Sequence, residues 1–131
     1  MHLLLDTHIL VWAMSAPERL SERARALLAD DGNALFYSGI SFVEAGIKQS
    51  IHPEVVLFDY VTIEADCQRA GLERVELSAA HAGVLAKLPL HHRDPFDRLL
   101  LSQAMSENMR LITADRALIA YGAVVAYVGP A

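Results

Sequence analysis

The residues best suited to chemistry in this sequence are four acids that stand where predicted strands end or predicted helices begin, namely Asp6, Glu44, Asp97 and Asp115. Asp6 follows an apolar run at 3–5, Glu44 comes shortly after a predicted strand at 34–38, and Asp115 follows one at 110–113. In open parallel sheets, ligands bind outside the carboxyl ends of the strands. One edge of the sheet is therefore expected to collect all four carboxylates.

Such a group of carboxylates needs a proton or a cation, because two of them held about 4 Å apart repel by roughly 4 kcal/mol at an effective dielectric near 20. The chain has one cysteine and six histidines, and no two histidines show the i, i+4 spacing of a helical zinc motif. An all-oxygen site indicates Mg²⁺ or Mn²⁺ rather than zinc. The predicted reaction is therefore metal-assisted hydrolysis of a phosphodiester bond.

The stretch HHRDPFDRLLLSQA, at 91–104, brings Asp97 to the start of a helix. Asp94 suits the N-cap and Pro95 the first helical position, where no backbone N–H is needed. Apolar residues then recur at the spacing of a helix face that packs on a core. A well-capped helix by itself also explains these acids, so the interpretation as a site depends on the convergence with Asp6, Glu44 and Asp115.

Polar residues next to the acids are candidates for accessory roles. Thr7 and Thr113 are expected to orient a carboxylate or a bound water, and Asp94 either to assist or only to cap. Ser41 and Glu44 have the spacing of a capping box, which predicts that Ser41 caps a helix.

Basic side chains are expected to guide phosphates to the acids, and the candidates are Lys48, Arg93, Arg98 and Arg116. Among the histidines, His92 stands out because it lies beside the acidic helix start, whereas the others are expected to be surface or packing residues.

The apolar pattern and the turn residues predict strands that alternate with helices, and hence a mostly parallel sheet with helices on both faces. Strands are expected at 3–5, 34–38, 74–77, 110–113 and 124–128. Helices are expected at 8–14, 22–28, 41–49, 53–70 and 79–88, after Asp94, and briefly from Asp115.

With 131 residues and 53% hydrophobic content, the chain is expected to form one domain, 1–131. It contains no apolar run long enough for a membrane span and begins without a basic leader, which predicts a soluble, unprocessed, cytoplasmic protein. The lone Cys67 fits a reducing compartment and is expected to be a packing residue. The net charge of -5 argues against binding nucleic acid by general electrostatics alone.

Four segments carry a resemblance to a known family: LLLDTHILVWA (3–13), SGISFVEAGIK (38–48), LPLHHRDPFDRLLLSQA (88–104) and LITAD (111–115). Together they make nearly the whole chain resemble PIN-domain proteins, and more narrowly the VapC-type toxins of bacterial toxin–antitoxin pairs. The resemblance implies a three-layer α/β fold with a mostly parallel central sheet flanked by helices.

The same resemblance implies an activity and partners. Asp6, Glu44, Asp97 and Asp115 match the acidic quartet of the family, with Asp6 and Asp97 as principal metal ligands. The implied activity is that of a Mg²⁺- or Mn²⁺-dependent endoribonuclease, restrained by a cognate antitoxin and commonly homodimeric. The DPFDR form resembles the branch whose antitoxins are often of the Phd/YefM type.

Two readings from other functional classes remain open. A strand-terminal Asp followed by Thr is also found in phosphoaspartate phosphatases of the HAD type, with Asp6 as nucleophile, although His8 stands where those enzymes have a second Asp. Alternatively, the fold is a non-catalytic module that binds an antitoxin or RNA. A nuclease of structured DNA is disfavoured, because the short chain has no insertion to clamp a duplex.

The nuclease reading predicts that Asp6→Asn or Asp97→Asn abolishes cleavage without unfolding the protein. Because each change removes one of several like charges, the melting temperature without metal is expected to stay equal or to rise.

Overall fold

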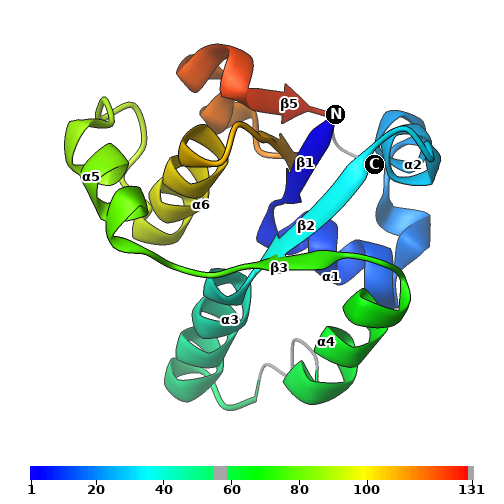
Figure 1. The fold of residues 1–131 in the computed structure, drawn as a ribbon. Helices are drawn as coiled ribbons and strands as arrows, with labels where there is room; N and C mark the ends of the chain where they lie inside the picture. Colours follow the sequence, from blue (N-terminus) through cyan, green and yellow to red (C-terminus); the bar gives the residue numbers. More distant parts are fainter. Residues whose placement is uncertain (55–58, 130–131) are drawn as a thin grey trace.

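Five parallel strands form the centre of the molecule, in the spatial order β3-β2-β1-β4-β5 (Figure 1). The computed structural model describes residues 1–54 and 59–129. The strands are β1 (His2–Leu5), β2 (Ala34–Ser38), β3 (Glu73–Val75), β4 (Arg110–Thr113) and β5 (Val125–Tyr127). The expected parallel sheet is therefore confirmed.

Six α-helices and two 3₁₀ helices lie among the described residues and connect these strands. The α-helices are α1 (Thr7–Ser15), α2 (Glu22–Ala29), α3 (Gly39–Ile51), α4 (Tyr60–Arg69), α5 (Ala79–Lys87) and α6 (Pro95–Ser106). The 3₁₀ helices are η1 (Pro17–Arg19) and η2 (Arg116–Val124).

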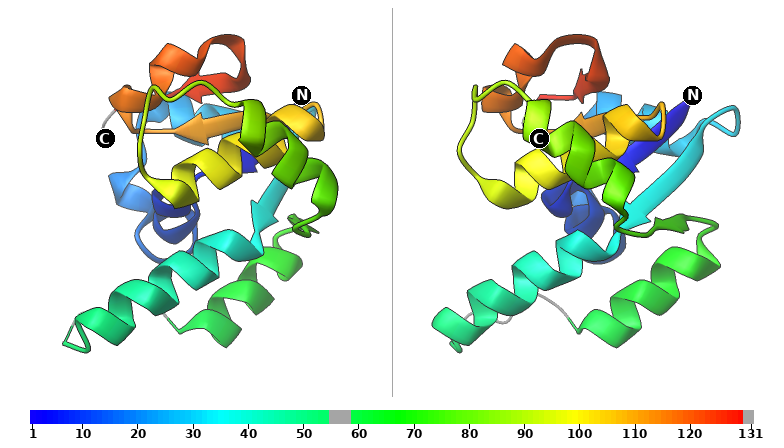
Figure 2. Two further views of the ribbon diagram at one scale, coloured as in Figure 1. Left: turned by 90° about the vertical axis from the view of Figure 1, so that its left-hand side faces the viewer. Right: turned by 60° about the vertical axis from the view of Figure 1, so that its left-hand side comes forward.

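The alternation of side chains along β1 divides the core into two layers. Leu3 and Leu5 lie in one apolar cluster with residues of α1, α2 and α4, whereas Leu4 lies in the other with residues of α6. Successive side chains of a strand point to opposite faces of the sheet, so an all-apolar strand is covered on both sides. Figures 1 and 2 show the resulting three layers, with α5 and α6 on one face of the sheet and α1, α2 and α4 on the other.

Most helix starts follow the predicted caps. Ser21 accepts a hydrogen bond from the Ala24 N–H, and Asp94 accepts one from the Phe96 N–H, so both are N-caps as expected. Helix α3 is the exception, because it begins at Gly39 and Ser38 caps it through the Ile40 N–H. The predicted capping box was wrong. Because Ser38, at the end of β2, already accepts a hydrogen bond from the free Ile40 N–H, the helix begins before Ser41, and Ser41 lies inside its first turn.

The helix predicted over 53–70 was too long. The described helix α4 starts at Tyr60 with Asp59 as its N-cap and ends at Arg69. Residues 53 and 54 form a turn, while 55–58, including the Val56 position on which the pattern relied, lie outside the described residues. Cys67 is fully buried among the apolar residues beneath α4, as expected of a packing residue.

In residues 1–54 and 59–129, none of the helices is long and apolar enough to span a membrane.

Candidate metal centre

The pairing of β1 with β4 places Asp6 beside Thr113. Leu5 lies opposite Ile112 in the register, and the Asp6 N–H donates to the Ile112 carbonyl, which extends the ladder past the strand end. The Thr113 hydroxyl donates to Asp6 Oδ2 at 2.5 Å, and the Thr7 N–H donates to Asp6 Oδ1 at 2.8 Å. Thr113 therefore fixes the orientation of the Asp6 carboxylate, while its predicted role at a functional site stays a prediction.

The charge of Asp6 is stabilised even though the residue is only 1% exposed. Burial acts to raise its pKa, but His8, whose Nε2 is 3.4 Å from Oδ2, and the bonds from Thr113 and Thr7 outweigh burial and lower the pKa. In return, the hydrogen bond to Asp6 is the main cause of a raised pKa of His8. Asp6 is held as a carboxylate with both oxygens engaged.

Glu44 reaches the site from the first turns of α3. The Thr7 hydroxyl donates to Glu44 Oε1 at 2.9 Å and lies 3.0 Å from the Ser41 hydroxyl, while Lys48 Nζ contacts Glu44 Oε2 at 2.8 Å. The bond between Glu44 and Lys48 raises the pKa of Lys48. Thr7 and Ser41 thus join the starts of α1 and α3, and Lys48 neutralises Glu44.

The surroundings of Asp97 disfavour its charged form. Burial, followed by the negative charges of Asp6 and Asp94, raises its pKa to about 7, although His92 acts in the other direction. Asp94 contributes to this effect while it caps α6, since it accepts hydrogen bonds from the N–H groups of Phe96 and Asp97.

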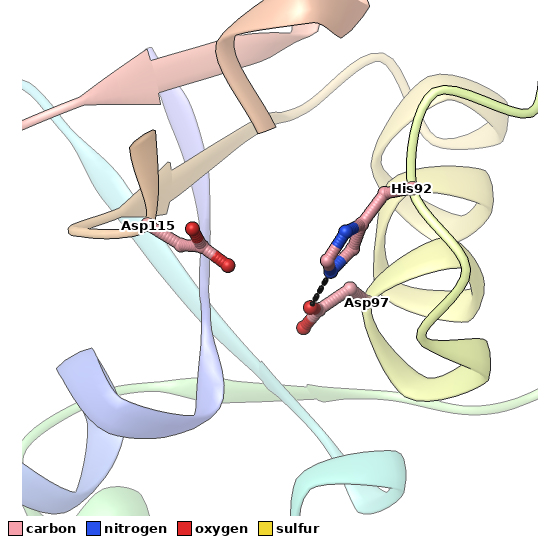
Figure 3. Close-up of side chains that lie close together, drawn as sticks. All are labelled: His92, Asp97 and Asp115. Atoms are coloured by element: carbon pink, nitrogen blue, oxygen red, sulfur yellow. Dashed lines mark hydrogen bonds and ion pairs between the residues drawn. The ribbon is translucent and has the colours of Figure 1, made fainter. Parts of the chain in front are cut away.

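Among the described residues, His92, Asp97 and Asp115 form a group of potential metal ligands, which we call the tight ligand group. One ligand atom from each lies within 4.8 Å of the other two, and His92 Nε2 is 2.9 Å from Asp97 Oδ2. Figure 3 shows Asp115, from the loop after β4, facing Asp97 on the start of α6 and His92 on the loop that precedes this helix. Asp115 also caps η2 through the Ala117 N–H. We refer to Asp6, Glu44, Asp97 and Asp115 as the carboxylate cluster.

The donor set of the carboxylate cluster fits a divalent cation. Asp97 shares a site with other acids that disfavour its charge, and a cation removes that penalty. Carboxylate oxygens are the usual ligands of Mg²⁺ and Mn²⁺, and one imidazole nitrogen is compatible with Mn²⁺. Asp6 does not belong to the tight ligand group, and its two oxygens are contacted by Thr7, Thr113 and His8.

The basic side chains near the site differ in their tasks. Arg98 donates to the carbonyl oxygens of Leu88, Pro89 and His92 and to the Tyr121 hydroxyl, so it holds the 88–94 loop, whereas the sequence indicated a phosphate guide. By contrast, Arg93 is exposed and contacts none of the described residues through an ion pair or hydrogen bond.

Sequence reasoning missed two contributors to the site. His8 contacts Asp6 and packs against Trp12. A sequence signal for this contact existed, because His8 comes two residues after a strand-terminal Asp, in the first turn of α1. Tyr121 accepts hydrogen bonds from the N–H groups of His91 and His92, but nothing in its local sequence linked it to a loop 30 residues earlier.

Comparisons with known proteins bear on the family and the fold of the chain. The family model described as PIN domain matches residues 3–124. Among solved structures, the chain is similar to VapBC2 from Rickettsia felis bound to a DNA fragment from its promoter, with 18% identity, a TM-score of 0.68 and coverage of 100% of both chains. It is also similar to VapBC-1 from nontypeable Haemophilus influenzae, with 18% identity, a TM-score of 0.64 and 98% of each chain covered.

A third structure, a toxin–antitoxin complex from Klebsiella pneumoniae, is 21% identical over 95% of each chain, with a TM-score of 0.61. No curated protein sequence matches this one significantly. At these identities the structural matches establish the fold, while the family model extends over nearly the whole chain. The chain belongs to the PIN domain family.

Proposed function

We propose that this protein is a divalent-metal-dependent endoribonuclease and the toxin of a VapBC-type toxin–antitoxin pair, folded as one PIN domain and acting in the cytoplasm. The observation that carries the proposal is the carboxylate cluster, in which the pKa of Asp97 is raised to about 7 by burial and neighbouring acids. Perturbed titratable groups that converge in this way are typical of functional sites. The family membership and the similarity to solved VapBC structures support the same activity.

In this proposal, Asp97 and Asp115 hold the ion together with Asp6, and Glu44 binds it through water. A bound Mg²⁺ or Mn²⁺ supplies Lewis acidity toward a phosphate oxygen and a water of lowered pKa. Thr113 and the Thr7 N–H keep the Asp6 carboxylate charged and fixed, while the Thr7 hydroxyl and Lys48 fix Glu44.

The exposed guanidinium groups of Arg93 and Arg116 are the side chains we assign to the RNA backbone. Each directly follows a residue of the tight ligand group in sequence, His92 and Asp115 respectively. Because most surface charge of this acidic protein repels RNA, a few cations beside the metal have to position the phosphates.

The environment of Asp6 argues against the phosphoaspartate alternative. A carboxylate nucleophile has to reach the substrate directly, and Asp6 is only 1% exposed. In addition, His8 stands where phosphoaspartate enzymes have a second Asp. We therefore keep the non-catalytic binding module as the second candidate function.

The proposed partners are RNA, a cognate antitoxin and a second copy of the chain. We assign the antitoxin to the Phd/YefM type on the sequence resemblance, and a basic segment of it would suit the carboxylate cluster. The homodimer has support in an exposed apolar stripe on α3, formed by Val43, Ile47 and Ile51.

The deciding experiment is cleavage of total cellular RNA by the purified protein with Mg²⁺ or Mn²⁺, with EDTA, and with the Asp97→Asn variant. Asp31→Asn is the matched control, because it removes the same charge from an exposed turn. Metal-dependent cleavage that Asp97→Asn lacks and Asp31→Asn retains is expected. No cleavage by the wild type under any condition, with antitoxin binding insensitive to EDTA, would favour the binding module.

A further inference from the structure

The side chain of His92 is placed where an ion held by Asp97 and Asp115 would meet it. Ligand atoms from the three residues lie within 4.8 Å of one another (Figure 3). Of these atoms, His92 Nε2 and Asp97 Oδ2 are 2.9 Å apart, which is about the separation of two adjacent ligands bonded to one ion at about 2.1 Å. Asp115 faces this pair, so a shift of its carboxylate toward the pair lets the three side chains share one ion.

The loop that carries His92 fixes its position through the backbone. The His92 N–H donates to the Tyr121 hydroxyl at 3.1 Å, and its carbonyl oxygen accepts from Arg98 at 3.5 Å. The Tyr121 hydroxyl in turn donates to the Pro89 carbonyl at 2.9 Å. Groups that hold a ligand's backbone in this way pre-organise its side chain.

The other imidazole of the site is less suited to ligation. His8 pairs with Asp6 across 3.4 Å, its side chain is 46% exposed, and it does not belong to the tight ligand group. The side chain of His92 is 26% exposed, and its Nε2 lies 2.9 Å from Asp97 Oδ2. His92 is thus the one nitrogen donor in the tight ligand group.

We infer that His92 is a direct nitrogen ligand of the divalent ion and makes the site prefer first-row transition ions such as Mn²⁺ over Mg²⁺; the inference rests on the proposed function. Mg²⁺ favours oxygen ligands and gives up water reluctantly, whereas imidazole nitrogen strengthens binding of transition ions. His92 must ligate as the neutral ring, so its contact with Asp97 is exchanged for a bond to the ion.

The first test measures binding of Mn²⁺ and of Mg²⁺ by calorimetry to the wild type, His92→Gln and His91→Gln. Glutamine keeps an N–H donor for Asp97 but has no imidazole nitrogen. His91 is the matched control because it neighbours His92, and its ring packs on Tyr121 with a centroid distance of 5.0 Å. We expect His92→Gln to weaken Mn²⁺ binding about tenfold or more and to change Mg²⁺ binding much less, with His91→Gln close to the wild type.

The second test detects the nitrogen directly, by pulsed EPR of the Mn²⁺-loaded protein. An imidazole bound to Mn²⁺ gives a ¹⁴N coupling, which histidine labelled with ¹⁵N shifts. We expect the coupling in the wild type and in His91→Gln and its loss in His92→Gln. The wild-type spectrum reports whether any histidine binds the ion, and absence of the coupling there would alone contradict the inference. The loss in His92→Gln assigns the coupling to His92 rather than to His8, and circular dichroism of the variant checks that it is folded.

Failure of the inference is distinguishable from failure of the proposed function. If Mn²⁺ binds and supports RNA cleavage but the wild type shows no ¹⁴N coupling, or His92→Gln retains the coupling, the inference is overturned while the nuclease stands. A His92→Gln variant that weakens Mn²⁺ and Mg²⁺ binding equally would also overturn it, because His92 would then only orient Asp97. If the wild type binds neither ion and cuts no RNA, both fail.

Discussion

Asp6 and Asp97 carry the same functional group in one carboxylate cluster, yet their surroundings oppose each other. Hydrogen bonds from Thr113 and Thr7, together with His8, stabilise the charge of Asp6 and lower its pKa. Burial and neighbouring acids destabilise the charge of Asp97 and raise its pKa to about 7. The surroundings thus favour the charged form of Asp6 and disfavour that of Asp97. A cation bound at Asp97 would remove this penalty, which contributes to the free energy of metal binding.

This contrast predicts opposite effects of two identical substitutions on stability without metal. At pH 8 in EDTA, Asp97→Asn is expected to raise the free energy of unfolding by about 1–3 kcal/mol, because it removes an unfavourable buried charge. Asp6→Asn is expected to lower it by about 1–3 kcal/mol, since the bonds from Thr113 and Thr7 lose their charged acceptor. Urea denaturation followed by circular dichroism measures both.

Like-charge repulsion alone, the basis of the sequence argument, predicts that Asp6→Asn leaves stability equal or raises it. A stabilised Asp6→Asn variant would therefore show that repulsion outweighs the hydrogen bonds at this position. Asp31→Asn, an acid in an exposed turn, serves as the baseline for loss of one negative charge.

The raised pKa of Asp97 also predicts how stability depends on pH without metal. Between the unfolded value near 4 and the folded value of about 7, the folded protein binds more protons at Asp97 than the unfolded chain does. Stability from this group therefore falls as pH rises through that window, by on the order of 2 kcal/mol, and is constant above it. The measurement is the unfolding free energy of wild type and Asp97→Asn between pH 5 and pH 8 in EDTA.

His8 also contributes to this pH dependence, because its raised pKa gives stability that is lost as pH rises through the folded value. The quantity to examine is therefore the difference between wild type and Asp97→Asn, in which the His8 contribution largely cancels. Parallel pH curves for the two proteins would contradict the assignment to Asp97.

Helix α6 carries Asp97 in its first turn and a buried glutamine, Gln103, further along. Gln103 is fully buried, and neither polar atom of its amide has a hydrogen-bond partner in the part of the chain that the structure describes. An unpaired buried amide costs about 1–3 kcal/mol. The helix tolerates this cost within an otherwise apolar face that includes Leu100 and Ala104.

Replacement of Gln103 by methionine, which has a similar shape and no unpaired amide, is expected to stabilise the protein by about 1–2 kcal/mol. Thermal and urea unfolding measure the gain. The matched control is Gln68→Met, which removes an amide that has a partner: Gln68 Nε2 donates to the Tyr37 hydroxyl at 3.3 Å. This control substitution is expected to destabilise the protein. A loss of stability in Gln103→Met would mean that the amide has a partner in solution.

Local signals in the sequence predicted the elements well where one cap residue dominated. Asp94 with Pro95, and Ser21, fixed the starts of α6 and α2 because no neighbour competed for the free N–H groups. Ser41 failed as a cap because Ser38 had already taken that task at the end of β2. Where two polar residues compete, the outcome depends on how the preceding strand enters the helix, which the local pattern does not contain.

The convergence of the acids could be expected from the sequence, but their supporting contacts could not. Asp6 and Asp115 come just after the neighbouring strands β1 and β4, so the topology of a parallel sheet brings them to one edge, while Asp97 reaches this edge from the start of α6. The roles of Arg98 and Tyr121 depend on how the 88–94 loop folds back onto η2, and that contact joins residues distant in sequence. A guanidinium bonded to loop carbonyls and one free to bind phosphate look the same in sequence.

At the scale of the whole molecule, helix α3 presents a surface that the fold itself leaves uncovered. Val43, Ile47 and Ile51 recur every four residues and are 57%, 42% and 66% exposed. Residues at this spacing lie on one face of a helix. Figure 2 shows α3 reaching out beyond the sheet. This is the surface we assign to the proposed homodimer.

A charge placed in the middle of this stripe should therefore separate the protomers. Ile47→Glu is expected to weaken self-association at least about tenfold, because a buried carboxylate without a partner costs more than 1.4 kcal/mol at an interface. Light scattering after size-exclusion chromatography, over a range of protein concentrations, measures the dimer fraction. Val61→Glu on α4 is the matched control, since Val61 is 82% exposed and lies outside the stripe.

The position of the stripe makes this test informative about function as well. Helix α3 also carries Glu44, which is only 6% exposed. Its side chain contacts Thr7 and does not belong to the stripe. Ile47→Glu should therefore weaken the dimer while leaving metal binding within about threefold of the wild type, because the two faces of α3 are separate. A monomeric wild type, or a variant that stays dimeric, would remove α3 as the interface and leave the apolar stripe to the antitoxin.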